Sequence, residues 1–168
     1  MAQLDPAMFL EAGRSRETKI RRDARGRWWN DQDPITHQNL AAAFDAWIER
    51  AEDGRYCLKN DINWAYVTIE GAPIDVRSVR VDPAGATLTL SDGRIEPLDL
   101  SSLREGPDGA LYCTVRGGTM PARFDSHAAM QLGEHAEQSD LGITIRIGLG
   151  SVAPPRVADP LASPGPSR

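Results

Sequence analysis

Several features that mark large classes of protein are missing from this 168-residue sequence. No apolar run approaches the ~20 residues that a membrane-spanning helix needs. Basic residues do not exceed acidic ones, since 19 lysines and arginines stand against 24 aspartates and glutamates, for a formal net charge of −5. This balance argues against a cationic protein that binds nucleic-acid polymers. We therefore expect neither a membrane nor a nucleic-acid polymer as a partner.

Cysteine is scarce, with only Cys57 and Cys113, and the two are not in a CxxC arrangement. Each lies in an apolar, strand-like stretch, which predicts a buried free thiol. A disulfide would need an oxidising compartment, and residues 1–6 lack the basic region and apolar core of a secretory signal. We therefore expect a cytoplasmic protein.

Common catalytic and cofactor motifs are also absent. The sequence contains neither a phosphate loop of the form G-x-x-x-x-G-K-[ST] nor a G-x-G-x-x-G motif after a strand. Of the three histidines, His127 and His135 are eight positions apart, about 80° around a helix, which is a poor spacing for a shared metal. Ser126 is adjacent to His127 and would point elsewhere, so a serine nucleophile is unsupported. We expect no cofactor and no metal, and an enzyme is the least favoured class.

What is present is a set of short strands and two helical stretches. Residues 1–15 predict a loose N-terminal arm. Residues 18–22 and 27–29 predict two strands joined by a tight turn at 23–26, with Gly26 in the left-handed position.

The clearest helix spans residues 39–51, with Thr36 as its N-cap and Gly54 at its C-terminal end. Its predicted core-facing stripe consists of Leu40, Ala43, Phe44, Trp47, Ile48 and Ala51. Its predicted solvent side consists of Asp45, Glu49, Arg50 and Glu52. The remaining strands are expected at 56–58, 63–69, 78–81, 86–90, 94–100, 110–115 and 143–147.

A second helix is expected to open near Pro121 and to run to about residue 138. Residues 151–168 are rich in proline, serine and alanine without periodicity, which predicts a disordered tail. These elements predict an α+β fold with antiparallel β-meander elements and two main helices. Because a strand–helix–strand order occurs twice, we expect two small subdomains with this repeated motif, at 16–82 and 83–150.

The bend Arg116-Gly117-Gly118 is the most suggestive short motif. Two glycines expose backbone N–H groups beside an arginine, and the expected helix would direct its N-terminus toward the bend. Arg123, one turn into that helix, would add a second positive group. This pattern favours a site for an anion or phosphate. The alternative is a strand-to-helix turn that needs glycine geometry and carries a surface arginine.

Large aromatic side chains offer a second candidate surface. The four tryptophans are Trp28, Trp29, Trp47 and Trp64. Core packing accounts for most of them, because a small domain must bury large side chains to be stable. An exposed tryptophan beside Arg27 or Lys59 could instead stack on a flat ligand such as a base.

A family resemblance rests on short segments in a fixed order: Gly26-Arg27-Trp28-Trp29, Pro34-Ile35, Leu40 and Phe44, Asp53-Gly54-Arg55-Tyr56-x-Leu58, Val67-x-Ile69-Glu70-x-Ala72-Pro73, Val115-Arg116-Gly117-Gly118 and Ala122-Arg123-Phe124. Over about residues 18–148 the chain resembles the bacterial family known as domain of unknown function 1285. The resemblance implies a two-domain α+β fold with repeated motifs. It also implies a cleft between the domains for a nucleotide-like ligand, and a role in signal transduction.

This chain departs from the family pattern at two places. Residues 60–64, Asn-Asp-Ile-Asn-Trp, replace a Thr-Pro-Val-Glu-Lys-like segment, and one extra residue separates Gly118 from Ala122. If the family's Glu–Lys pair lines the cleft, its charge pattern is lost here and the ligand differs. The resemblance therefore transfers site residues at Arg116, Gly117, Gly118 and Arg123 more directly than at Asn60 and Asn63.

We therefore expect a small-molecule binding or sensing protein with a signalling role, whose anionic or nucleotide-like ligand lies between the two halves. The alternative is a protein-interaction module without a ligand, and the sequence specifies no oligomeric state. The candidate ligand-binding residues are Arg116, Gly117, Gly118, Arg123, Lys59, Asn60 and Trp64.

Overall fold

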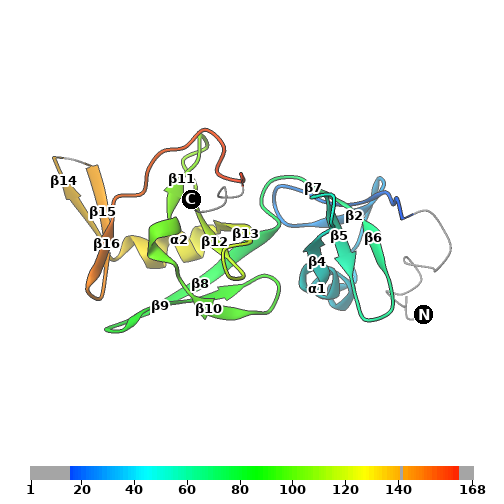
Figure 1. The fold of residues 1–168 in the computed structure, drawn as a ribbon, viewed down its shortest axis with the longest axis horizontal. Helices are drawn as coiled ribbons and strands as arrows, with labels where there is room; N and C mark the ends of the chain where they lie inside the picture. The colour runs from blue at the N-terminus through cyan, green and yellow to red at the C-terminus, as the bar shows by residue number, and fades with distance from the viewer. Residues whose placement is uncertain (1–15, 141, 163–168) are drawn as a thin grey trace. The chain divides into compact units, whose positions relative to one another are not determined.

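A computed structural model describes residues 16–140 and 142–162 (Figure 1). The predicted N-terminal arm at 1–15 lies outside the described residues. The chain divides into two compact units, unit 1 at Met1–Pro73 and unit 2 at Ile74–Arg168. Within the described ranges there are two α-helices and four β-sheets, and most strand pairs are antiparallel. The α+β class, the two helices and the mostly antiparallel pairing are therefore confirmed.

Unit 1 contains two sheets and one helix. The first sheet has the order β3-β2-β1-β7 and the second the order β4-β5-β6. Its elements are β1 (Ile20–Arg22), β2 (Trp28–Asn30), β3 (Asp33–Pro34), α1 (Gln38–Trp47), β4 (Ile48–Arg50), β5 (Tyr56–Lys59), β6 (Trp64–Tyr66) and β7 (Thr68–Ile69). The predicted strand at 63–69 is thus two strands, because β6 pairs with β5 whereas β7 pairs with β1.

The helix α1 is shorter than its apolar pattern predicts. His37, not Thr36, is the N-cap, and its side chain accepts a hydrogen bond from the backbone N–H of Leu40. The helix ends at Trp47, because Ile48 starts β4 and pairs with Leu58 of β5. Gly54, with φ of 87°, belongs to the β4–β5 hairpin turn and does not cap the helix. An apolar residue such as Ile48 suits a helix stripe and a strand equally well.

Asp45 was expected on the solvent side of α1 but is buried, with 6% of its surface exposed. Its Oδ1 accepts hydrogen bonds from Arg22 Nε at 3.1 Å and from Trp28 Nε1 at 2.9 Å. Arg22 is 1% exposed, and its Nη1 also donates to the carbonyl of Ala72. Polar partners from β1 and β2 thus allow a carboxylate to lie in the core of unit 1.

Unit 2 is built on a six-stranded sheet of order β10-β9-β8-β13-β12-β11 and a three-stranded sheet of order β14-β15-β16. The elements are β8 (Ile74–Asp82), β9 (Gly85–Leu90), β10 (Ile95–Pro97), the 3-10 helix η2 (Leu100–Ser102), β11 (Arg104–Glu105), β12 (Leu111–Val115), β13 (Met120–Phe124), α2 (Ser126–Gly133), β14 (Ala136–Ser139), β15 (Gly142–Ile147) and β16 (Gly150–Val152). β8 pairs with β9 from Val76 to Asp82, and unit 2 begins at Ile74, so residues 74–82 belong to unit 2.

The second helix was predicted too long at both ends. Residues 120–124 form β13, which pairs with β12 on one side and β8 on the other, and α2 begins only after the N-cap Asp125. Beyond α2, residues 136–139 form β14. Met120, Ala122 and Phe124 are all buried, as expected for a strand in the middle of a sheet. A helix contacting β8 and β13 follows this strand (Figure 1).

The C-terminal segment differs from the expected disordered tail over residues 151–162. Residues 150–152 form β16 on the edge of β15, and the backbone of Glu105 bonds that of Pro155 and Val157. Arg104 donates two hydrogen bonds to the carbonyl of Pro160, at 2.9 and 2.6 Å. Residues 163–168 lie outside the described part of the chain. No helix in the described part is long and apolar enough to cross a membrane.

Candidate functional site

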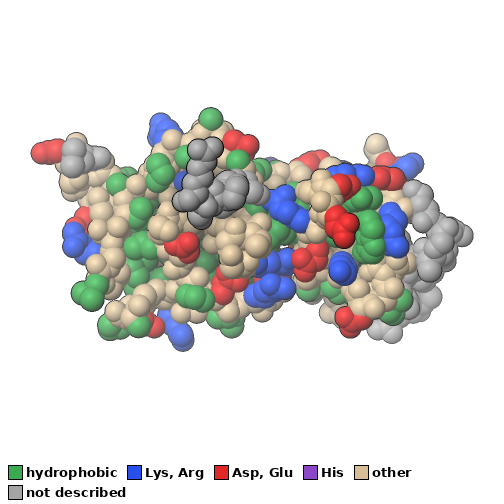
Figure 2. Space-filling view, viewed as in Figure 1, with side chains coloured by type: hydrophobic (Ala, Val, Ile, Leu, Met, Phe, Trp, Pro, Cys, Tyr) green, Lys and Arg blue, Asp and Glu red, His purple; other side chains and the backbone are tan. Residues whose placement is uncertain are grey.

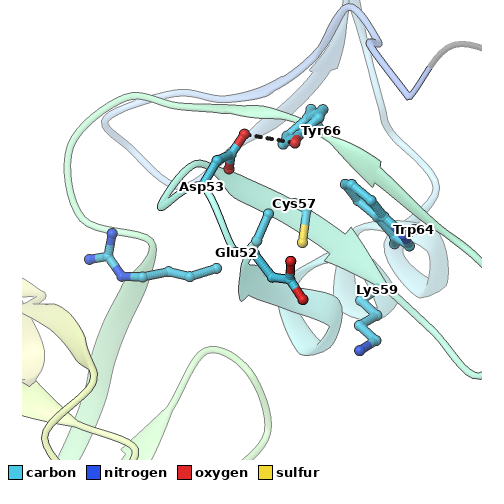
Figure 3. A pocket seen from close by; sticks show the side chains of 8 residues that line it. Glu52, Asp53, Cys57, Lys59, Trp64 and Tyr66 are labelled. Carbon is cyan, nitrogen blue, oxygen red and sulfur yellow. Dashed lines mark hydrogen bonds between the residues drawn. The ribbon is translucent and has the colours of Figure 1, made fainter.

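A pocket of about 510 Å³ lies in unit 1, over the second sheet and the turn between β4 and β5 (Figure 3). It brings together two residues predicted from the sequence, Lys59 and Trp64, which face each other across the β5–β6 pair. The residues that line the pocket are Arg50, Ala51, Glu52, Asp53, Cys57, Lys59, Trp64 and Tyr66.

Strand alternation explains why these side chains gather on one side of the sheet. Ile48, Leu58 and Ala65 form one cross-strand row, and all three are buried in the core of unit 1. Residues one position away on each strand point to the opposite face. Cys57 and Tyr66 form a register pair there, so the pocket occupies the face of the sheet that does not pack on the core.

Two aromatic rings form a wall of the pocket. Trp64 and Tyr66 meet edge to face, with ring centroids 5.1 Å apart and an interplanar angle of 84°. The guanidinium carbon of Arg16 lies 4.2 Å from the Trp64 ring centroid, and that of Arg55 lies 3.7 Å from the Tyr66 ring centroid. Cation–π contacts of this kind hold the rings in a fixed orientation.

Backbone and side-chain bonds from the N-terminal side tie this wall to the rest of unit 1. The Arg16 carbonyl accepts from the Tyr66 N–H at 2.7 Å, and Thr18 Oγ1 donates to the Tyr66 carbonyl at 2.6 Å. Arg55 forms a two-pronged ion pair with Glu17, with both distances 2.8 Å. The orientation of the wall therefore depends on residues that do not line the pocket.

Two of the four charged residues in the lining are engaged in hydrogen bonds. Asp53 Oδ2 accepts from the Tyr66 hydroxyl at 2.7 Å, the dashed line in Figure 3. This hydrogen bond is the main reason why the pKa of Asp53 is lowered and the pKa of Tyr66 is raised. Arg50 donates to the Tyr56 hydroxyl at 3.1 Å and lies over its ring. These two charges are therefore already used to hold the hairpin.

The side chains of the other two charged residues, Glu52 and Lys59, form no hydrogen bond or ion pair with any residue in the described part of the chain. Both side chains are exposed. Figure 2 shows basic, acidic and hydrophobic side chains interspersed over unit 1, the half on the right of the view. The available charge of the pocket is thus one carboxylate and one ammonium group.

The Cys57 thiol also lines the pocket but is 2% exposed. Burial, followed by the nearby Glu49 carboxylate, raises the pKa of Cys57. A thiol with a raised pKa stays protonated near neutral pH and is a poor nucleophile. Both cysteines are buried and free, as the sequence predicts.

Asn60, a third candidate from the same hairpin, does not line the pocket. Its Oδ1 accepts from the backbone N–H groups of Ile62 and Asn63, at 2.9 and 2.8 Å. Such an Asx turn fixes the connection between β5 and β6. Asn60 therefore shapes the hairpin that presents Lys59 and Trp64.

The remaining candidates lie in unit 2. Arg116, Gly117 and Gly118 form the β12–β13 turn with φ values of 53°, 66° and 89°. A strand, not a helix, follows the bend, so the helix N-terminus expected beside it is wrong. Arg116 Nε and Nη2 both lie 2.9 Å from Asp92 Oδ2, and its backbone N–H donates to Glu96.

Arg123 lies elsewhere on the same hairpin. It pairs with Tyr112 near the start of β12, whereas the bend follows Val115 at the end of that strand. Its Nη2 is 3.5 Å from Asp108 Oδ2. Arg116 and Arg123 therefore contact different carboxylates, and the charge of each is offset by its own partner.

Several pocket residues were missed from the sequence. Glu52 and Asp53 were assigned to the end of a helix, and this assignment concealed the hairpin that places them beside β5. Trp64 and Tyr66 are two positions apart in the strand predicted at 63–69, so period-two alternation puts them on one face, and this spacing is the available signal for the aromatic wall.

The molecule is a two-unit α+β protein in which strands predominate. Two solved bacterial proteins of the DUF1285 family share this fold. A DUF1285 family protein from Silicibacter pomeroyi DSS-3 matches with a TM-score of 0.64 and 20% identity, over 80% of this chain and 78% of that one. One from Shewanella baltica OS155 matches with a TM-score of 0.53 and 17% identity, over 67% of this chain and 87% of that one.

The family that the sequence motifs resemble is therefore also the family of both structural matches. At these identities the likeness concerns the fold. No protein-family model matches the chain, and no curated protein matches it.

Proposed function

We propose that this protein binds a small molecule with a flat ring and an anionic group in the pocket of unit 1, and that binding serves a sensing or signalling role. One observation carries the proposal. Lys59 and Trp64 are register partners that line the same pocket. The ammonium group of Lys59 has no hydrogen bond or ion pair among the described residues. A cation beside a fixed aromatic ring supplies both contacts that such a ligand needs.

The size of the pocket supports this proposal. Ligand pockets for drug-sized molecules typically span about 300–1,000 Å³, and this one measures about 510 Å³. A nucleotide-like molecule, the class implied by the family resemblance, would place its base on Trp64 and its phosphate at Lys59. Stacking of a base on an aromatic side chain contributes about 1–3 kcal/mol.

A thermal-shift screen tests the proposal, with AMP, GMP and simple aromatic carboxylates as probes. We expect at least one probe to raise the unfolding midpoint of the wild-type chain, and Trp64→Ala and Lys59→Ala each to reduce that rise. Arg123→Ala is the matched control, because it removes a partly exposed cation from unit 2 and should leave the rise unchanged. The proposal fails if no probe stabilises the chain, or if the stabilisation survives both pocket substitutions.

A protein-interaction module is the second candidate, and exposed apolar side chains favour it. In unit 2 these include Ile95, Met130, Ile143 and Leu149. Exposed apolar area can mark a contact surface. If the partner is a second copy of this chain, light scattering should show a dimer, and the double variant Ile143→Ser/Leu149→Ser should disrupt it. The small-molecule probes should then leave the unfolding midpoint unchanged.

The repeated strand–helix–strand motif also remains a proposal. The order β3–α1–β4 in unit 1 and β13–α2–β14 in unit 2 supports it. Superposing these two segments, with their flanking hairpins, would test whether they share one backbone path.

A further inference from the structure

The pocket of unit 1 holds two opposite charges that have no ion-pair partner among residues 16–140 and 142–162. Glu52 and Lys59 both line the pocket, and neither forms an ion pair with the other or with another described residue. In Figure 3 Asp53 is bonded to Tyr66, whereas no dashed line reaches Glu52 or Lys59. A ligand therefore meets one free carboxylate and one free ammonium group.

We propose that the pocket recognises a small zwitterion with an aromatic body, such as an aromatic amino acid. The ligand's ammonium group would pair with Glu52, its carboxylate with Lys59, and its ring would pack on Trp64 and Tyr66. This inference rests on the proposed function, because it names the ligand class of the same pocket. It adds a cationic group to the anionic group already proposed.

The charge balance of the lining favours a ligand without net charge. The lining contains two acidic and two basic side chains, and one of each sign is already held by hydrogen bonds. A ligand with several phosphate charges would find a single free cation and would approach the Glu52 and Asp53 carboxylates. The phosphate groups and these carboxylates would repel each other, and the repulsion grows as the ligand excludes water.

The neutral surface of the pocket favours an aromatic body. The Trp64 and Tyr66 rings are fixed by Arg16 and Arg55, so little side-chain freedom is lost when a ring packs against them. The Cys57 thiol beside them stays protonated and so presents an uncharged surface. These contacts explain how a small ligand could gain affinity beyond its two charges.

Isothermal titration calorimetry on the full chain tests the inference with four probes. L-Phenylalanine carries both charges, phenethylamine only the positive one, 3-phenylpropionate only the negative one, and AMP is the nucleotide comparison. We expect L-phenylalanine to bind most tightly, and each single-charge probe to bind about 2- to 5-fold more weakly, as loss of one partly exposed charge pair implies.

Charge-removing variants assign each contact. Glu52→Gln should weaken binding of L-phenylalanine and phenethylamine but not of 3-phenylpropionate, and Lys59→Gln should weaken L-phenylalanine and 3-phenylpropionate but not phenethylamine. Glu134→Gln, an exposed site in unit 2, is the matched control and should change none of them.

Two outcomes overturn the inference, and they are distinguishable. If 3-phenylpropionate or AMP binds at least as tightly as L-phenylalanine and Glu52→Gln has no effect, the ligand is an anion and only the zwitterion is wrong. If none of the four probes binds, the inference and the proposed function both fail for this pocket.

Discussion

Two hairpins of this chain carry the same residue types in nearly the same order and use them differently. In unit 1, Tyr56 and Cys57 of β5 are followed by Lys59. In unit 2, Tyr112 and Cys113 of β12 are followed by Arg116. Lys59 lines a pocket with no ion-pair partner among the described residues, whereas Arg116 is paired with Asp92, whose side chain is 1% exposed.

The difference lies in residues that are distant in the sequence. Arg116 meets Asp92 and Glu96, which are 24 and 20 positions away, because the β9–β10 turn and β10 bring carboxylates to the β12–β13 turn. Of the two acidic side chains that line the pocket with Lys59, Asp53 is bonded to Tyr66, and Glu52 forms no ion pair with Lys59. A basic residue beside a turn therefore indicates an anion site only after its carboxylate neighbours are known.

Removing Arg116, the paired cation, should produce the largest change in the free energy of unfolding. Arg116→Ala would leave the buried Asp92 carboxylate without its main partner, which costs about 3 kcal/mol when one member of a buried ion pair is deleted. Lys59→Ala, at an exposed site, should change the free energy of unfolding by less than about 0.5 kcal/mol. Urea unfolding of both variants measures the contrast, and equal losses would show that the two hairpins do not differ in this way.

The second largest effect should be a difference between the two cysteines in how much each lowers the free energy of unfolding at alkaline pH. Burial raises the pKa of Cys113 to about 12, whereas the pKa of an unfolded cysteine is about 8.5. Above that value the unfolded chain loses its thiol proton while the folded chain keeps it, so stability is complete below it and falls as pH rises. Between pH 8 and pH 10 the loss from this group is about 2 kcal/mol.

Urea unfolding at pH 8 and pH 10 measures this loss, with Cys113→Ala as the variant that should reduce the pH dependence. Cys57→Ala is the control, because the pKa of Cys57 is raised less strongly. If Cys113→Ala loses as much stability between pH 8 and pH 10 as the wild type, the alkaline loss comes from other groups.

The smallest of these effects concerns the turn that presents the pocket. Asn60→Ala removes the acceptor of two backbone N–H groups at an exposed turn, so we expect a loss of about 1 kcal/mol in the free energy of unfolding. Asn60→Asp keeps the acceptor and should restore most of the stability. If both variants behave like the wild type, the Asx turn does not fix the hairpin.

Much of the fold could be predicted from local patterns. Alternation identified most strands, turn residues such as Gly26 marked the hairpins, and the apolar context of Cys57 and Cys113 indicated burial. These signals act over a few residues, and local pattern reasoning detects them.

What could not be predicted depends on distant partners. Asp45 is polar and was placed in solvent, because nothing near it in the sequence indicates Arg22 and Trp28 as its partners. Residues 120–124 suit a helix by composition, yet they lie between two strands that require extended backbone. For the site, Lys59 and Trp64 were identified, but the pocket itself needed the β4–β5 turn that the overlong helix concealed.

The hydrogen bonds from Arg104 to Pro160 have a practical consequence for anyone who shortens this chain. A truncation chosen on the proline- and serine-rich composition would end the protein near residue 150 and remove the carbonyl that this half-buried guanidinium binds. Pro160 also lies against Gly106, where even a methyl group would come within 2.9 Å of it. The segment that resembles a dispensable tail is bonded to β11 over residues 155–160, so its removal would expose that edge of the six-stranded sheet in unit 2.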